Sequence, residues 1–287
     1  MINIKKKMLN LLPDSIYLKL LYYRMIGKKL NLNNPQTFNE KLQWLKLHDR
    51  DPQHTIMADK FAVREFIKNT IGEEYLIPLI GVWDNFDDID FDKLPNEFVL
   101  KPNHTSGDIF ICENKSQINI EELRHQVEAW MKREYFWVNR EWPYKNIKPL
   151  IIAEKYMKSK LDHDIKDYKI MVFNGEAKCA FVCSNRSRKN GLNVTFFDME
   201  WNVMPFERHY PKDKNKIQKP ENFKKMIELA EFLSKDNIFS RIDFYEIDNQ
   251  LYFGEITFYP GSGFEEFSPS EYDLLLGSWI SLPIDRK

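Results

Sequence analysis

The stretch RIDFYEIDNQLYFGEITFYPGSG, residues 241–263, holds the pattern that decides the fold assignment. Two runs of strand-forming residues flank the short turn 248–250, which predicts two antiparallel strands joined by a hairpin. Strand period two puts Arg241 with Asp243, and Glu255 with Thr257, on common faces. The hairpin is therefore expected to bring Asp243 alongside Glu255, so that two carboxylates converge on one spot.

Converging carboxylates in a sheet repel each other and lose hydration, so they need a positive partner. Arg241 offsets part of this charge. A hard Mg²⁺ ion takes oxygen ligands of this kind and usually shares them with substrate phosphates. The pattern favours a metal site at Asp243 and Glu255, although an exposed hairpin with ordinary surface charge explains residues 241–257 equally well when they are taken alone.

A second segment is FVLKPNHTSGD, residues 98–108. An apolar strand ends in Lys101 directly before a small polar turn, whose N–H groups and hydroxyls suit phosphate oxygens. The Gly-Lys-Ser/Thr order of a Walker loop is absent. His104 lies in this turn, where it either touches phosphate or an acceptor or has a structural role. A plain surface turn is the alternative explanation.

A third segment is IIAEKYM, residues 151–157, and Asp167 begins the next predicted strand. A connection of this type offers backbone groups to an adenine edge and an acid to ribose hydroxyls. A strand that ends in surface charge is the alternative.

Together, and in this order, the three segments resemble the ATP-grasp superfamily, and within it the TupA-like group associated with teichuronopeptide and capsular polysaccharide synthesis. The resemblance runs from about Pro35 to Gly263 and includes TFNEKLQW at 37–44 and ADK at 58–60. It implies an α+β fold of two lobes with largely antiparallel sheets that clasp ATP, plus a helical N-terminal region. The implied cofactors are ATP and Mg²⁺.

The resemblance assigns ATP contacts to residues of several segments: Lys60, Lys101, His104, Thr105, Ser106, Gly107, Glu154, Lys155, Tyr156, Met157 and Asp167. By this assignment Lys60 and Lys101 approach the phosphates, and the turn 103–107 covers them. Residues 154–157 line adenine, and Asp167 lies near the ribose.

The resemblance also assigns the metal and catalytic residues. Asp243 and Glu255 are the implied Mg²⁺ ligands, and Thr257 stands where family members often have Asn, which predicts a weaker or water-mediated contact. Arg241 and the Gly261 region face the transferred phosphoryl group and the developing oxyanion, and Lys101 is counted with them. Arg186, in a basic turn after the strand that ends at Cys183, is a further candidate because such a turn can cover phosphate or an acidic polymer; a solvated turn is the alternative.

The implied reaction is activation of a carboxylate by ATP to an acylphosphate, followed by attack of an amine and loss of phosphate. The expected partners are a uronic acid or polysaccharide precursor and an amino acid or small amine. No enzyme nucleophile is needed, which agrees with the absence of a convincing Ser-His-Asp or Cys-His pattern.

Two other functions compete with this one. Asp88, Asp90 and Asp92 imitate the Asp-x-Asp metal signature of many sugar-nucleotide glycosyltransferases, but a solvated acidic turn is the interpretation that we favour. A calcium loop is excluded because its Gly and terminal Glu are missing. The third possibility is a catalytically silent nucleotide-binding scaffold, suggested by Thr257.

The composition and charge of the chain limit the functions that it can have. The chain has 287 residues, 43% hydrophobic content and a formal charge of −1, so it supports a large core and has no field suited to nucleic acid. Residues 1–30 carry a local charge of +6. We expect a cytoplasmic protein with possible peripheral contact at the inner membrane face through residues 1–30. Three cysteines without further ligands predict reduced core thiols.

The expected organisation is a helical N-terminal region (1–75), a small ATP-grasp lobe with the phosphate loop and a linker (76–150) and a large lobe with the metal site (151–287). Helices are expected over 14–25, with Leu18, Leu21 and Met25 on one face, from Thr37, whose spacing from Glu40 is that of a capping box, and over 58–67.

Overall fold

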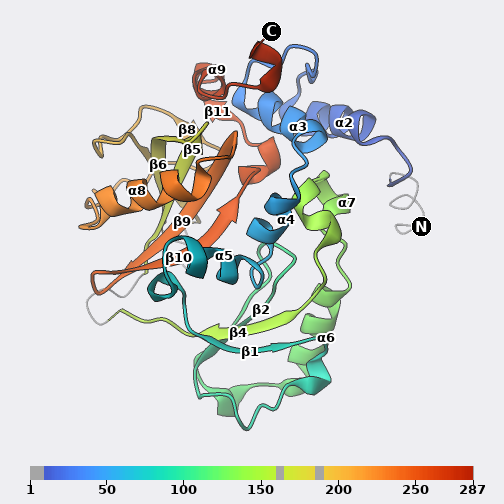
Figure 1. The fold of residues 1–287 in the computed structure, drawn as a ribbon, viewed down its shortest axis with the longest axis vertical. Coiled ribbons are helices and arrows are strands. Elements are labelled where there is room, and N and C mark those ends of the chain that lie inside the picture. The colour runs from blue at the N-terminus through green and yellow to red at the C-terminus, as the bar shows by residue number, and fades with distance from the viewer. Residues whose placement is uncertain (1–9, 160–164, 185–190, 287) are drawn as a thin grey trace. The chain divides into compact units, whose positions relative to one another are not determined.

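The computed structural model of the protein describes residues 10–159, 165–184 and 191–286 (Figure 1). The chain divides into two compact units. Unit 1 combines Met1–Arg50 with Lys166–Lys287, and unit 2 is the segment Asp51–Ile165. Helices and antiparallel sheets occur in both, which confirms the expected α+β class.

Unit 2 contains a four-stranded sheet in the order β1-β4-β2-β3, with every neighbouring pair antiparallel. Its strands are β1 (Leu79–Trp83), β2 (Phe98–Pro102), β3 (Phe110–Cys112) and β4 (Ile151–Lys155). Because β4 pairs with both β1 and β2, it belongs with the strands that precede it. The observed division therefore does not follow the expected boundary at residue 150.

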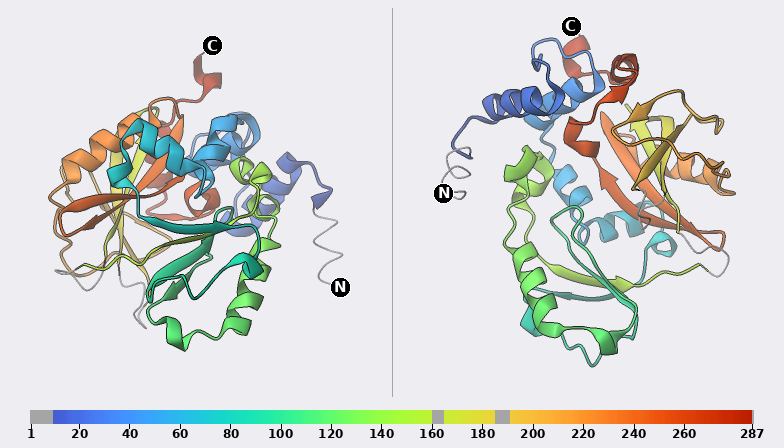
Figure 2. Two further views of the ribbon diagram at one scale, coloured as in Figure 1. Left: turned by 60° about the horizontal axis from the view of Figure 1, so that its bottom comes forward. Right: turned by 180° about the vertical axis from the view of Figure 1, so that it is seen from behind.

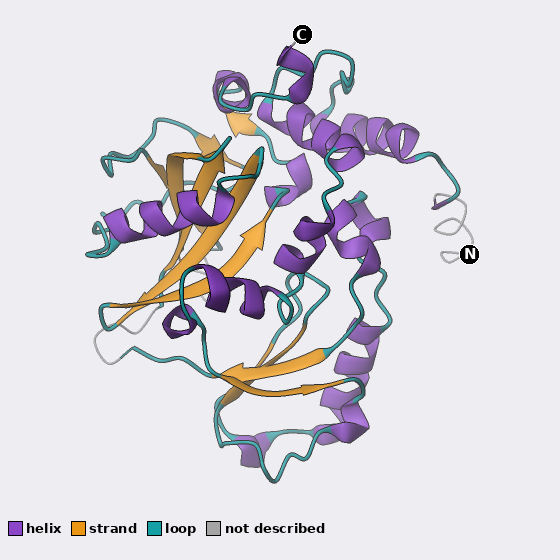
Figure 3. Ribbon diagram, viewed as in Figure 1, coloured by secondary structure: helices purple, strands orange, loops and turns teal. Residues whose placement is uncertain are grey.

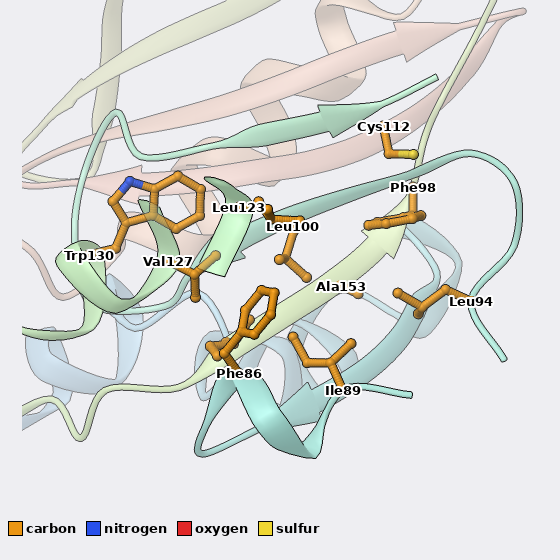
Figure 4. Packing of buried hydrophobic residues seen from close by; sticks show 11 residues of the cluster. Phe86, Ile89, Leu94, Phe98, Leu100, Cys112, Leu123, Val127, Trp130 and Ala153 are labelled. Atoms are coloured by element: carbon orange, nitrogen blue, oxygen red, sulfur yellow. The ribbon is translucent and has the colours of Figure 1, made fainter. Parts of the chain in front are cut away.

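The core of unit 2 lies between this sheet and helix α6 (Ile120–Met131), as Figure 4 shows. Burial alternates along β2, where Phe98 and Leu100 are fully buried and Lys101 is half-buried. The buried cluster consists of Phe86, Ile89, Leu94, Phe98, Leu100, Cys112, Leu123, Val127, Trp130, Ile151 and Ala153. Strand period two thus leaves Lys101 on the face opposite this core.

Short helices complete unit 2: α4 (Pro52–Ala58), α5 (Val63–Thr70), α7 (Phe136–Asn139) and the 3₁₀ turns η1 (Glu73–Tyr75), η2 (Phe86–Asp88), η3 (Lys115–Gln117) and η4 (Trp142–Asn146). The expected single helix over 58–67 is wrong, because the chain breaks between α4 and α5. Asp59 is extended there, and its carboxylate accepts the backbone N–H groups of Phe61 at 2.8 Å and Ala62 at 3.2 Å. An Asp side chain that binds nearby N–H groups competes with the helical hydrogen bonds.

Unit 1 contains a five-stranded antiparallel sheet in the order β10-β9-β5-β6-β7. Its strands are β5 (Asp167–Phe173), β6 (Glu176–Ser184), β7 (Asn193–Phe197), β9 (Phe239–Ile247) and β10 (Gln250–Thr257), and helix α8 (Phe223–Ser234) runs along the sheet (Figure 3). The expected hairpin turn at 248–250 is confirmed, since Asp248 and Asn249 have positive φ. Asn174 and Gly175, between β5 and β6, also have positive φ.

The two faces of this sheet differ in chemistry. Ile170 lies opposite Ile242, and both are fully buried. Tyr168 shares their face and contacts Trp201, which in turn contacts Phe223 of α8. Lys169 lies opposite Asp243 and Met171 lies opposite Arg241, one residue out of phase with the apolar set. The charged side chains therefore gather on the face away from α8.

The remaining elements of unit 1 are α2 (Asp14–Ile26), α3 (Phe38–His48), α9 (Glu271–Ser278), the two-residue strands β8 (Glu207–Arg208) and β11 (Phe267–Ser268), and the 3₁₀ turns η5 (Pro260–Gly263) and η6 (Pro283–Arg286). Phe38 of α3 contacts Phe173, Phe239 and Phe267, which attaches the N-terminal helices to the sheet. The strands β8 and β11 were not predicted, because two residues are too short to show a periodic pattern.

Helix α2 ends within one residue of its expected end, and the capping box of α3 is confirmed. The buried face of α2 is different from the expected one. Leu18 is fully buried, but Met25 is 53% exposed, and Tyr22 and Ile26 are buried instead. The buried stripe therefore advances by four residues per turn.

The three cysteines are free thiols, as expected. Burial raises the pKa of Cys179 to about 12. In the part of the chain that the structure describes, no helix is long and apolar enough to cross a membrane.

Candidate active site

A charged group in unit 1 is centred on Arg241, on the sheet face away from α8. Arg241 Nε lies 2.7 Å from Asp243 Oδ1, and its Nη2 lies 2.7 Å from both Asp243 Oδ2 and Glu255 Oε1. Thr257 donates its hydroxyl to Glu255 Oε1 at 3.3 Å. The structure thus brings together the four residues expected here, with one guanidinium between two carboxylates.

A β-bulge puts Glu255 on this face. Between Gln250 and Phe253 the register is regular, and its continuation would place Glu255 opposite Ile242, on the apolar face. The register instead shifts between Phe253 and Ile256, so that Ile256 lies opposite Ile242. Gly254 lies in the bulge, where an added Cβ would come within 3.1 Å of the Asp243 carbonyl oxygen. An extra residue at a bulge reverses the faces of the residues that follow it.

Strand β5 adds a lysine that the sequence analysis did not select. Lys169 lies opposite Asp243 and pairs with that carboxylate, and its Nζ lies 2.7 Å from Asp167 Oδ2. All three side chains are buried. Asp167, expected near the ribose, therefore belongs to the same charged group. The signal was available as the Asp-x-Lys alternation at the start of a strand, but the pairing of β5 with β9, which carries Asp243, was not predicted.

Burial controls the electrostatics of this group. Desolvation raises the pKa of Asp243 to about 6, against the opposing effects of Arg241 and Lys169. Desolvation also disfavours the charged form of Arg241, but the neighbouring Asp243 and Glu255 outweigh it and raise the pKa of the guanidinium. The pKa of Lys169 is raised as well, because three carboxylates outweigh its burial and the nearby Arg241. Both cations therefore stay charged beside the carboxylates.

The chain turns tightly after β10, and helix α3 holds this turn. Gly261, Ser262 and Gly263 all have positive φ, at 58°, 54° and 64°. Gln43 Nε2 donates to the carbonyls of Ser262 at 3.0 Å and Gly263 at 2.8 Å, and Lys46 Nζ donates to the Ser262 carbonyl at 2.8 Å. Gln43 and Lys46 are buried. Helix α3 thus shapes the region around Gly261 that the sequence analysis assigns to the oxyanion.

In unit 2, Glu154 pairs with two cations on the sheet face opposite the core. Lys101 Nζ lies 2.6 Å from Glu154 Oε2, and Arg64 Nη1 lies 3.3 Å from Oε1. Val99 lies opposite Glu154 in the register, so Lys101 is a diagonal neighbour of Glu154 on one face. Arg64 was not among the predicted site residues, because the break before α5 was not predicted.

The same break brings Lys60 against the loop that follows β2. Lys60 Nζ donates to the Thr105 carbonyl, and its backbone N–H donates to the Asn103 carbonyl at 3.1 Å. Asn103 Nδ2 donates to Asp59 Oδ1 at 2.9 Å, and Gly107 has a φ of 83°. The expected phosphate loop is thus a defined turn with a lysine packed on it.

His104 is buried in this loop, at 3% exposure. Burial lowers its pKa, so the imidazole is neutral at neutral pH. Neither ring nitrogen has a hydrogen bond of good geometry within the described residues. A buried neutral ring favours the structural role over a contact with phosphate.

The other expected ATP residues differ in exposure: Ser106, Gly107 and Lys155 are exposed, Tyr156 and Met157 are half-buried, and Thr105 is buried. Tyr156 donates its hydroxyl to Glu113 at 3.0 Å. Arg186 lies outside the described residues.

The acidic stretch of the glycosyltransferase alternative is exposed. Asp88, Asp90 and Asp92 are all accessible, and Asp90 pairs with Lys93 at 2.8 Å. A solvated turn of this kind supports the structural interpretation over a nucleotide-sugar site.

Whether Mg²⁺ fits depends on the donors that remain. Within the described ranges, no three His, Cys, Asp or Glu side chains gather as ligands of a metal ion. Asp243 and Glu255 nevertheless both contact the guanidinium of Arg241, and the hydroxyl of Thr257 contacts Glu255. Mg²⁺ is commonly held by one or two carboxylates, with waters and substrate phosphates completing its coordination. This oxygen-only donor set therefore fits a Mg²⁺ ion that binds together with ATP.

Helices and antiparallel sheets in two units are the architecture expected from the resemblance to the ATP-grasp superfamily. The model of the family described as TupA-like ATPgrasp matches residues 40–281, so the chain belongs to the TupA-like ATP-grasp family. The predicted family is thereby confirmed.

Several solved structures are similar to this chain. D-alanine–D-alanine ligase from Bacillus anthracis complexed with ATP is 17% identical, with a TM-score of 0.44 over 78% of this chain and 63% of that one. The RimK domain protein ATP-grasp from Sphaerobacter thermophilus DSM 20745 is 9% identical, with a TM-score of 0.43 over 79% of this chain and 69% of that one.

The chain spans about three fifths of the length of the D-alanine–D-alanine ligase from Bacillus anthracis, at 57% and 63% in two structures. No curated protein sequence matches it. The family match, and not these structural likenesses, carries the assignment.

Proposed function

We propose that this protein uses ATP to join a carboxylate to an amine. A carboxylate oxygen attacks the γ-phosphorus of ATP, and the bond from that phosphorus to ADP breaks. The amine nitrogen then attacks the carbonyl carbon of the acylphosphate, the C–O bond to phosphate breaks, and the nitrogen loses a proton. The observation that carries this proposal is the group of Arg241, Asp243 and Glu255, because it combines a fixed cation with oxygen donors on one sheet face.

The residues of the chain have separate roles in phosphoryl transfer. Lys60 and Lys101 offset the phosphate charge, and the turn 103–107 covers the phosphates through its N–H groups. Arg241 orients the transferred phosphoryl group. Mg²⁺, when bound at Asp243 and Glu255, supplies further positive charge to the phosphates.

Stabilisation of the oxyanion in the second step is the role of Arg241 and of the backbone near Gly261. A fixed cation and N–H groups aimed at the developing charge are the usual means of stabilising a tetrahedral intermediate. The hydrogen bonds from α3 to the carbonyls of Ser262 and Gly263 support this role, because the groups that bind an oxyanion have to be in position before the reaction.

The proposed substrates are a uronic acid of a capsular or cell-wall polysaccharide precursor and an amino acid or small amine. Membership of the TupA-like family supports the polysaccharide part, and the buried cations Arg241 and Lys169 suit an anionic acid. Use of ATP supports a cytoplasmic place of action.

The experiment measures ADP release from Mg-ATP with D-glucuronate or D-galacturonate as the acid and glycine or ammonium as the amine. We expect ADP to form when both are present, and Glu255→Gln to serve as the blank. ADP release that is indifferent to the acid would contradict the reaction. Release with other carboxylates alone would contradict the substrate class, and consumption of a nucleotide sugar without ATP would support the glycosyltransferase alternative.

A further inference from the structure

Helix α2 is apolar on two faces. Leu18, Tyr22 and Ile26 form the inner face and pack with Leu30 and Phe264 in one buried cluster. Figure 2 shows α2 beside α3, and this cluster accounts for its attachment to unit 1. The inner face of α2 is thus already buried within unit 1.

The outer face of α2 carries large apolar side chains in water. Ile16, Leu20 and Tyr23 are 47%, 58% and 62% exposed. Their spacing, i, i+4 and i+7, puts them on one side of a helix. Leu11, just before the helix, is 85% exposed. Single exposed apolar residues are ordinary, but an aligned stripe on a short helix indicates a contact surface.

Cations border this stripe. At about 100° per residue, Lys19 and Arg24 lie on opposite sides of the line through Ile16, Leu20 and Tyr23. Lys28 and Lys29 follow the helix and are exposed.

The single acidic residue of this segment is already paired. Asp14 forms an ion pair with Arg50, with 3.3 Å between Asp14 Oδ2 and Arg50 Nη2. Among the residues that the structure describes, the outer face of α2 therefore combines apolar side chains with cations that form no ion pair.

We propose that the outer face of α2 docks on an anionic membrane surface. An apolar stripe bordered by Lys and Arg is the pattern of helices that lie in the plane of a bilayer, because the long cationic side chains reach the headgroups while the apolar residues enter the acyl boundary. Anionic lipid is the occupant that this charge favours. Each cation near such a surface strengthens binding about fivefold.

The test is co-sedimentation of the full chain with vesicles of phosphatidylcholine alone and of phosphatidylcholine with phosphatidylglycerol. We expect binding to the anionic vesicles that weakens as NaCl is raised. The variant Ile16→Ser/Leu20→Ser/Tyr23→Ser should bind at least about tenfold more weakly, and Lys19→Gln/Arg24→Gln, which removes two cations, should bind about 25-fold more weakly.

A matched control replaces three apolar residues of unit 1 with similar exposure. Val203, Phe232 and Leu274 are 56%, 51% and 52% exposed, so Val203→Ser/Phe232→Ser/Leu274→Ser removes as many exposed apolar side chains elsewhere. This control should bind vesicles like the unmodified chain. Thermal unfolding verifies that all variants are folded, which is expected because every replaced residue is exposed.

Three outcomes would overturn the proposal. The first is equal recovery in the supernatant with both lipids, and the second is vesicle binding that the α2 variants leave unchanged. The third is absence of vesicle binding together with a concentration-dependent dimer that the α2 triple variant abolishes, because that would assign the face to a second copy of the chain.

Discussion

Of the two proposed Mg²⁺ ligands, Glu255 is the one whose replacement should disturb the structure least. Its side chain is 34% exposed, whereas Asp243 is buried between Arg241 and Lys169 and balances their charge. Removing the Asp243 carboxylate would break its buried ion pairs with both cations and leave Arg241 only Glu255 and Lys169 only Asp167, at a cost to stability of about 3–5 kcal/mol. Glu255 is therefore the cleaner position for a test.

We expect Glu255→Gln to lower the rate of ADP formation by about a hundredfold or more, because a charge of the proposed Mg²⁺ site is lost while the side-chain shape is kept. The measurement is steady-state ADP release at saturating Mg-ATP. Glu246→Gln is the matched control, since Glu246 lies on the same hairpin but accepts hydrogen bonds from Asn222. Equal rates in the two variants would remove Glu255 from the metal site.

Lys101 is predicted to contact an ATP phosphate. Loss of a charge-assisted contact costs about 1.5–3 kcal/mol, so Lys101→Met should weaken ATP binding by about tenfold or more. Calorimetry with a non-hydrolysable ATP analogue measures this. Lys148→Met removes a lysine from an exposed ion pair with Asp84 in the same unit and should leave affinity unchanged. If Lys101→Met also binds normally, the lysine serves only its ion pair with Glu154.

At the scale of elements, α3 connects the N-terminal segment to the turn after β10. Lys46 and Lys41 offer a matched pair on this helix, because both are buried lysines that donate to a backbone carbonyl. Lys46 donates to Ser262 in the turn at 2.8 Å, and Lys41 donates to Ile280 at 2.7 Å.

Lys46→Met and Lys41→Met should each lower the free energy of unfolding by about 1–3 kcal/mol. We expect only Lys46→Met to reduce kcat as well, by about tenfold, with the KM for ATP unchanged, because the turn is proposed to bind the oxyanion. Thermal unfolding and steady-state kinetics below the unfolding range measure the two effects. Parallel losses of kcat in both variants would reduce α3 to a purely structural element.

The hairpin 241–257 shows how far sequence reasoning reaches. Alternation correctly predicted the strands and paired Arg241 with Asp243. The hairpin was also expected to bring Glu255 alongside Asp243, but alternation alone does not give this placement, because a regular continuation of the register puts Glu255 on the apolar face. The bulge at Gly254 corrects this, and a glycine in a strand only indicates that a bulge is possible.

The helix break at Asp59 could not be predicted from the sequence for a similar reason. The segment 58–67 has helical periodicity, but the carboxylate of Asp59 binds two nearby N–H groups and Asn103 from a distant loop. Long-range contacts of this kind leave no local pattern. Lys60 was therefore selected from the resemblance, and Arg64 was not selected at all.

At the scale of the whole molecule, the division of the chain follows contacts that are distant in sequence. Residues 1–50 belong with the C-terminal sheet because Phe38, Gln43 and Lys46 reach residues beyond 170. Periodicity predicted several helices and strands but not which of them share a unit. The family assignment depended on the order of several weak motifs along the chain, and the family match confirms it.

The central claim is that a carboxylate is activated by phosphoryl transfer, and transfer of ¹⁸O tests it most directly. If a carboxylate oxygen attacks the γ-phosphorus and the C–O bond later breaks, that oxygen leaves with phosphate. Uronic acid labelled with ¹⁸O in its carboxylate should give inorganic phosphate that carries one ¹⁸O atom per amide formed, as read by mass spectrometry. Unlabelled phosphate released together with amide would contradict the acylphosphate mechanism.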